Sequence, residues 1–334
     1  MFAYLVKRLI SGALVVTLVS IAIFLLFWFG PSSPAQTICD RETSNRCGDR
    51  IEIYEKTLGY NNPVHEEYLK WAKGVFVGRD IQIASTTYEC DAPCLGVSYL
   101  TKQSVSEELA SRLPATISVA VGGAFLYLLF GIPIGVAAAR RRGTVADKAL
   151  VSSFLFLSSI PYYLFALLTW LYLTVLWEAP FVSDTGYFPI TENPAKWFGG
   201  MFLAWVALGI FGCTQYTRYT RGAMVEALSE DYIRTARAKG LREGTVVYKH
   251  GLRAALVPVV TIFGIDFGIL LAGTIFTERI FDIDGIGFWS LQAVQQKDLP
   301  VVAATALFSA VLLIISNLIV DVIYSVLDPR VRLS

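Results

Sequence analysis

The sequence predicts an all-α polytopic membrane protein with six transmembrane helices, both termini in the cytoplasm and a small folded extracytoplasmic loop domain. Three observations predict this class. Hydrophobic residues make up 54% of the 334 residues and charged residues only 16%, which is unusual for a soluble protein of this length. Several runs are long and apolar enough to cross a bilayer core, which takes about twenty residues. Lysine and arginine gather in alternate loops between these runs.

The apolar runs cover residues 9–29, 113–139, 149–177, 197–217, 254–277 and 299–320. The first run follows Lys7 and Arg8, so a cleaved signal peptide is the alternative to a membrane helix. We favour an uncleaved helix, because the run is longer than a typical signal core and no A-x-A site follows it. Pro161 lies inside the third run, where we expect it to kink the helix.

Positive charges set the expected orientation, because short loops rich in Lys and Arg stay in the cytoplasm. Basic residues cluster over 140–148 and 218–253, whereas the short loops on the other side carry few of them. We therefore expect the long loop 30–112 to lie outside. The chain then divides into an N-terminal transmembrane helix (1–29), an extracytoplasmic cap (30–112) and a membrane core (113–334) that contains the cytoplasmic segment 218–253.

The cap is predicted to be folded. Apolar spacing indicates short helices that end at Gly59, cover 64–77 and cover 105–113, where Pro114 would begin the next helix.

The cap also carries four cysteines, Cys39, Cys47, Cys90 and Cys94, on the side expected to be oxidising. Four cysteines allow three disulfide pairings, and we prefer Cys39 with Cys47 and Cys90 with Cys94. A four-cysteine zinc site is the alternative, but the spacing of the first pair is poor for zinc. Cys213, inside the fourth run, is expected to be a packed apolar residue.

The motifs that would indicate an enzyme are missing from the sequence. There is no phosphate-binding G-x-x-x-x-G-K-[ST] loop, no H-E-x-x-H and no G-x-S-x-G. The two histidines, His65 and His250, fall on opposite sides of the membrane in the expected topology. We therefore expect neither catalysis nor a metal site nor a bound cofactor in this chain.

Asp266 interrupts the fifth run. A carboxylate at the centre of a span costs about 2.5–3.5 kcal/mol on the insertion scale, so it must face a polar partner or water. It could be a packing group held by a hydrogen bond to a neighbouring helix. It could equally line the path of a solute, and we take Asp266 as the candidate for that path.

The cytoplasmic segment contains the densest positive charge and predicts a short helix. Ser229 is a plausible N-cap and Gly240 a plausible left-handed C-cap residue. Tyr232, Ile233 and Ala236 share one face at helical spacing. A helix of about ten residues is marginal alone in water, so this one needs a surface: its own protein, the bilayer or a partner.

Several stretches resemble one known family. DYIRTARAKGL followed by LVP, with FAYLVKRLI at the start, SRLPATISVAV, GIPIGVAAARRRGTVAD and NLIVDVIYSVLDPRV at the end, is similar to the permease subunits of binding-protein-dependent ABC importers. The closest resemblance is to the branch that imports dipeptides, oligopeptides and, in some members, nickel. It covers nearly the whole chain.

The resemblance implies that the short helix is a coupling helix that sits in a groove of an ATPase subunit. The matching residues are Ser229, Glu230, Asp231, Tyr232, Ile233, Arg234, Thr235, Ala236, Arg237, Ala238, Lys239, Gly240 and Leu241. Within this set the resemblance places Ala236 and Gly240 at small positions that allow close packing.

The resemblance also implies the partners and the location. They are a second permease subunit, two ATPase subunits that use ATP and Mg, an extracytoplasmic solute-binding protein and the lipid of a bacterial or archaeal cell membrane. No nucleic acid is expected.

The chain departs from the family pattern in four places. Arg234 stands where an acidic residue is general, residues 78–82 replace a Gly-Asp-Leu-Gly stretch, the paired cysteines are added, and Asp266 replaces an uncharged residue. The alternative function is an ion-coupled secondary transporter with Asp266 as proton carrier. It would need broken helices or inverted repeats, and neither is evident in the sequence. A purely structural membrane scaffold is a third class.

Overall fold

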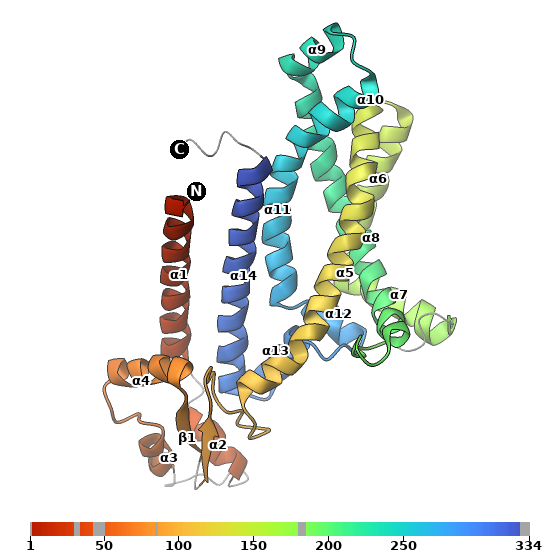
Figure 1. Cartoon of the computed structure of the whole chain (residues 1–334). Helices are drawn as coiled ribbons and strands as arrows, with labels where there is room; N and C mark the ends of the chain where they lie inside the picture. Colours follow the sequence, from red (N-terminus) through yellow and green to blue (C-terminus); the bar gives the residue numbers. More distant parts are fainter. Residues whose placement is uncertain (1, 30–33, 43–50, 84–85, 180–184, 328–334) are drawn as a thin grey trace. The chain divides into compact units, whose positions relative to one another are not determined.

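The computed structural model describes residues 2–29, 34–42, 51–83, 86–179 and 185–327. The chain forms two compact units. The first contains Met1–Pro114 and Ile286–Leu312, and the second contains Ala115–Gly285 and Leu313–Ser334. Helices make up most of both units (Figure 1), which confirms the predicted helical class.

Five helices of the described residues are long and apolar enough to cross a membrane, and a bent helix pair makes a sixth if it counts as one span. The five are Val6–Phe29, Val105–Arg140, Pro194–Ser229, Glu243–Ala272 and Leu299–Val320. Four of the six predicted runs fall inside these helices, the fifth run continues past the helix end at Ala272, and the third run falls on the bent pair. Gly273 follows with φ +118°, a backbone conformation that glycine adopts readily.

The bent pair lies where one kinked span was predicted. Helix α6 (Val145–Ser159) is followed by α7 (Tyr162–Trp170) and a π-helical turn, η2 (Leu171–Leu176), and the two parts meet at 88°. The break falls at Pro161. Ile160 before it is extended, with φ −81° and ψ 128°, as expected because the proline ring disfavours helical geometry in the preceding residue. Pro161 therefore breaks the run instead of only kinking it.

The first unit joins the cap to parts of the membrane helices. Its elements in chain order are α1 (Phe2–Phe29), α2 (Pro34–Glu42), α3 (Ile51–Thr57), α4 (Val64–Val77), β1 (Arg79–Ile83), β2 (Thr86–Cys90), the start of α5 (Val105–Arg140), α13 (Ile286–Gln295) and the first part of α14 (Leu299–Leu327). The predicted cap helices at 51–58 and 64–77 are confirmed as α3 and α4.

The cap contains a hairpin that the sequence did not suggest. Strands β1 and β2 pair antiparallel, with Arg79 opposite Cys90 and Ile83 opposite Thr86. This two-stranded sheet is a small addition to the predicted all-α class. Ile83 and Cys90 turn inward with Val97 into a small apolar core, which gives the hairpin one buried face and holds its register.

Helix α5 begins in the first unit and continues into the second as one 36-residue helix. We expected a separate helix over 105–113, with Pro114 beginning the next one. The structure places Pro114 in the interior of α5 instead. Proline removes one helical hydrogen bond, but both flanks are anchored: Val105 and Leu109 pack in one buried cluster and Ala115 and Val119 in another.

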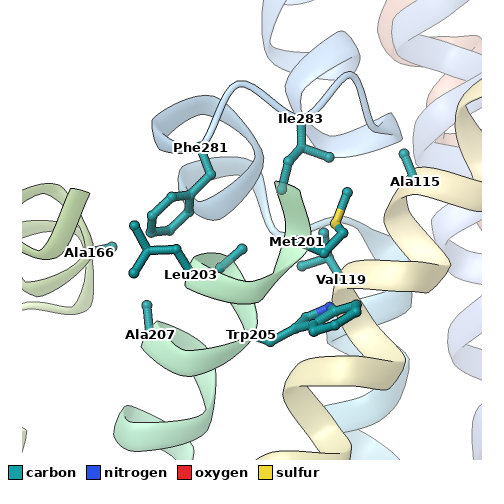
Figure 2. Packing of buried hydrophobic residues seen from close by; sticks show 10 residues of the cluster. Ala115, Val119, Ala166, Met201, Leu203, Trp205, Ala207, Phe281 and Ile283 are labelled. Carbon is teal, nitrogen blue, oxygen red and sulfur yellow. The ribbon is translucent and has the colours of Figure 1, made fainter. Parts of the chain in front are cut away.

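The second unit contains the rest of α5, α6, α7, η2, α8 (Pro194–Ser229), α9 (Asp231–Ala238), α10 (Glu243–Thr245), η3 (Val246–Gly251), α11 (Leu252–Ala272), α12 (Ile275–Ile280) and the end of α14. Its main apolar cluster joins α5, α7, α8 and the segment after α12 through Val119, Ala166, Met201, Leu203 and Phe281. Figure 2 shows Trp205 of α8 directed toward α5, where its Nε1 donates a hydrogen bond to the Ser118 carbonyl at 2.8 Å.

Glycines allow α5 and α8 to lie close together. A Cβ on Gly135 would come within 2.8 Å of the Thr217 carbonyl oxygen, and one on Gly131 within 2.9 Å of Tyr216 Cβ. Thr217 also donates a hydrogen bond to the Gly131 carbonyl, at 3.2 Å. Glycines of the second run therefore serve helix packing. They fix α8, the helix that leads to the candidate site.

Candidate functional site

The first part of the candidate site is the short helix α9, which follows α8 after a single residue. Glu230 ends α8 and caps α9, with φ −67° and ψ 151°. Ser229 was the predicted N-cap, and this is wrong. Ser229 is the last helical residue of α8, where its hydroxyl donates to the Glu226 carbonyl at 2.7 Å, and Glu230 occupies the N-cap position instead. No side chain makes the cap hydrogen bond at Glu230.

The C-terminal end of α9 is closed by a Schellman motif. Gly240 has φ +74°, as the sequence predicted. Its N–H donates to the Arg237 carbonyl at 2.9 Å, and the Leu241 N–H donates to the Ala236 carbonyl at 3.3 Å. These are the two bonds of the motif, and they satisfy carbonyls that would otherwise face water.

One face of α9 packs on its own chain. Ile233 is 0% exposed and Ala236 is buried, and both contact Val246 of η3, with Leu228 of α8 packed against the group. Tyr232, predicted to share this face, is instead exposed. The small side chain of Ala236 therefore serves packing within the chain.

The other face of α9 is exposed and charged. Asp231 and Arg234 form an exposed pair at 3.2 Å. Arg237 makes a two-bond ion pair with Glu243 of α10, at 2.8 and 3.1 Å, and this contact raises the pKa of the Arg237 guanidinium. Glu243 thereby ties the end of α9 to the segment that returns to the membrane.

The surrounding helix ends hold this segment in place. Asp147 at the start of α6 is buried and accepts two hydrogen bonds from Arg221 of α8, both at 2.7 Å. The Gly143 N–H donates to the same carboxylate at 3.0 Å. The ion pair between Asp147 and Arg221 was not predicted from the sequence. Its only signal there was Asp147 itself, a lone acid inside the basic stretch RRRGTVADK.

The second part of the candidate site is the carboxylate of Asp266 on α11. Tyr216 of α8 donates its hydroxyl to Asp266 Oδ2 at 2.9 Å. The Tyr216 ring stacks on Tyr127 of α5, with 4.6 Å between the ring centres. Tyr127 Oη is buried and has no hydrogen-bond partner among the described residues. Asp266 itself is half-buried. The two tyrosines were not found from sequence, because tyrosine in an apolar run gives no signal of its own.

The cysteines and histidines hold no metal site in the part of the chain that the structure describes, where no group of three or more His, Cys, Asp or Glu is placed to bind an ion. Cys90 and Cys94 form a disulfide, as preferred. Cys39 is also disulfide-bonded, whereas Cys47 lies outside the described residues, so its pairing stays a prediction. Cys213 is free and buried, as predicted.

The structure therefore places the predicted residues at two separate positions of the second unit. Ser229 is the last residue of α8, and residues 230–241 form α9 and its caps directly after it. Asp266 lies within the span α11, against α8 and α5. One position can bind a partner through exposed charges, and the other can offer the half-buried carboxylate of Asp266 to a polar solute.

Comparison with known proteins finds matches over most of the chain. Residues 131–333 match the family described as the binding-protein-dependent transport system inner membrane component, and residues 1–120 match the N-terminal part of such components.

Individual relatives match over almost the full length. The chain is 31% identical to a probable peptide ABC transporter permease of Sinorhizobium fredii, over 99% of this chain and 100% of the relative. It is 34% identical to a putative peptide transport system permease of Brucella abortus, and 33% identical to a glutathione transport system permease of Salmonella choleraesuis, in each case over 99% of both chains. The chain therefore belongs to the family of inner membrane components of binding-protein-dependent transport systems.

Proposed function

We propose that this chain is a permease subunit of an ATP-driven importer that moves di- or oligopeptides across a bacterial inner membrane. It pairs with a second permease subunit, and two ATPase subunits bind on the cytoplasmic side. A solute-binding protein delivers cargo on the side of the cap. The peptide cargo is supported by relatives named as peptide and glutathione permeases, which match this chain over 99% of its length.

The observation that carries the proposal is the position of α9. Helix α8 has 36 residues and is therefore about 54 Å long at 1.5 Å per residue, whereas a hydrocarbon core is about 30 Å thick. Its C-terminal end must project well beyond the bilayer. Figure 1 shows α9 at this projecting end of α8, away from α7 and α12. An exposed, charged helix at the projecting end of α8 is suited to contact an ATPase subunit as a coupling helix.

The proposed cycle uses α9 as the contact through which nucleotide binding acts. ATP and Mg bind only to the ATPase subunits, whose closure draws the coupling helices of the two permeases together. Hydrolysis then resets the cavity toward the cytoplasm. The nucleotide thus biases an equilibrium between two states of the permease pair.

Asp266 is proposed to line the cargo path. A peptide carries a positive amino terminus, and a carboxylate in a low-dielectric wall attracts it. Tyr216 holds the carboxylate by one oxygen, Oδ2, and its ring is supported by stacking on Tyr127. A weak polar site of this kind can bind a cargo that must also leave.

The first test is co-purification of the full chain with its complex in mild detergent, followed by mass spectrometry. ATPase subunits and a second permease should accompany it. The charge reversal Arg234→Glu on exposed α9 should weaken this association, whereas Lys196→Glu, at the opposite end of α8, is the matched control and should not. Recovery of the chain without ATPase subunits under all detergent conditions would contradict the proposal.

An ion-coupled secondary transporter is the second candidate, because the break at Pro161 gives the chain one broken helix, a feature of such transporters. A secondary transporter would show uptake that follows a proton gradient in vesicles without ATP. Uptake that needs ATP and is insensitive to the proton gradient excludes this candidate.

A further inference from the structure

A cavity of about 440 Å³ lies in the first unit, between the cap and the ends of two membrane helices. Ile23, Phe27 and Trp28 line it from the last turns of α1, and Leu299 and Ala303 line it from the start of α14. Both helix segments belong to candidate membrane spans. The cavity therefore lies where a membrane helix leaves the hydrocarbon and enters the headgroup region.

The walls of the cavity are fixed by aromatic contacts between α1 and the cap. Trp28 stacks on Tyr60 with 4.4 Å between ring centres, and Phe24 contacts Tyr68 and Trp71 at 5.5 and 6.1 Å. Ser20 and Tyr68 are hydrogen-bonded at 2.9 Å. Tryptophan and tyrosine favour this level of a membrane because their rings are apolar at one end and polar at the other. The rings make an apolar floor of fixed shape.

The polar wall of the cavity comes from the cap and contains an incompletely paired cation. Arg79 Nε is buried and has no hydrogen-bond partner among the described residues, and burial lowers the pKa of this guanidinium. The side chain lies across Gly74 of α4, where an added Cβ would come within 2.5 Å of Arg79 Cδ. The missing side chain at Gly74 thus makes room for Arg79, and a buried guanidinium with an open donor is suited to a phosphate.

The other charges of the cavity lining are paired or lie on the opposite face of β1 from Arg79. Lys70 is paired with Glu67 at 2.7 Å, and Asn62 donates to the same oxygen of Glu67 at 2.7 Å. Asp80 follows Arg79 directly in β1 and is exposed, so its side chain leaves the opposite face of the strand. Arg79 is therefore the charge that the lining offers to a ligand, which favours a phosphate group.

We propose that this cavity binds one phospholipid. The phosphate accepts hydrogen bonds from Arg79. The first part of the acyl chains lies along Phe27 and Leu299. This bound lipid joins the cap to α1 and α14, whose side chains supply the apolar half of the site.

The test is lipid binding to the full chain in its complex, purified in detergent, stripped of lipid and titrated with defined lipids under native mass spectrometry. We expect one phosphatidylethanolamine or phosphatidylglycerol molecule to bind saturably, and either one more tightly than diacylglycerol, which has no phosphate. Arg79→Gln should weaken binding of both phospholipids about tenfold, since it removes the charged partner of the phosphate, and should leave the weaker binding of diacylglycerol unchanged.

Lys73→Gln is the matched control. Lys73 lies on α4 beside Gly74, is exposed and does not line the cavity, so lipid binding should remain that of the wild type. Gly74→Ala is a second variant that displaces Arg79 and should reproduce Arg79→Gln. Thermal unfolding and the Cys90–Cys94 disulfide report whether each variant is folded.

Three outcomes would overturn the proposal. One is equal affinity of the wild type for the phospholipids and for diacylglycerol. Another is equal loss of binding in Lys73→Gln and Arg79→Gln. The third is displacement of the lipid by inorganic phosphate or by a dipeptide at millimolar concentration, which would make the cavity a site for a free anion or for cargo.

Discussion

Replacing Gly240 tests the role of α9 most directly. Gly240 has φ +74°, and a Cβ added there meets nothing within 4 Å. The cost of a side chain is therefore confined to the backbone, where the left-handed conformation costs an ordinary residue about 1–2 kcal/mol. Gly240→Val should carry at least this cost because valine is β-branched. Gly240→Asn is the matched control, since asparagine visits this conformation far more readily.

A cost of about 1–2 kcal/mol changes a local equilibrium roughly 5- to 30-fold. The N–H of Leu241, which donates to the Ala236 carbonyl at 3.3 Å, reports on the intact Schellman motif. Its protection from hydrogen exchange should fall by that factor in Gly240→Val and much less in Gly240→Asn.

Binding-protein-stimulated ATP hydrolysis by reconstituted complexes should fall in the same order, with the permease still inserted. Equal protection in both variants would refute the conformational argument. Lost protection with unchanged stimulation and uptake would show that α9 is not the coupling element.

Three further predictions concern the rest of the chain. Asp266→Asn should reduce uptake and change the preference among differently charged peptides, while most coupled ATPase activity remains. Wild-type uptake and selectivity in this variant would rule out a cargo contact. Asp266→Leu should also lower the stability measured by thermal unfolding, by about 1–3 kcal/mol, because it leaves the Tyr216 hydroxyl unpaired. Ile233→Ala should destabilise the packing of α9 by about 2–4 kcal/mol, seen as faster amide exchange across α9 alone, and unchanged exchange would mean that this face is not held by its own chain. Alkylation and intact-mass analysis without reduction should find Cys39 and Cys47 protected together, and a free thiol at Cys47 would exclude the preferred pairing.

The membrane helices could be predicted from sequence because a bilayer imposes one simple requirement, a run of about twenty apolar residues. The helix ends could not be predicted as well. Pro114 and Pro161 are the same residue type in similar surroundings, yet one lies inside a continuous helix and the other separates two helices at 88°. The difference depends on packing of the flanking residues, which local propensity does not contain.

The candidate site shows the same limit. The positive φ of Gly240 was predictable because only backbone chemistry decides it. The partner of Asp266 was not, because Tyr216 is 50 residues away in sequence and meets it only after α8 and α11 have packed. Arg79 and Gly74 are closer in sequence, but the guanidinium lies over the glycine only because β1 begins directly after α4 ends.

The packing of α9 on its own chain has a thermodynamic consequence for assembly. Ile233 and Ala236 are already buried against Val246, so the helix does not have to fold when an ATPase subunit arrives. Association then avoids the ordering entropy that a disordered segment loses on binding. The heat-capacity change should reflect only the surface covered at the interface, without the larger contribution of coupled folding. In the proposed importer, movement of the ATPase subunits would therefore reach α8 through a helix that is already folded.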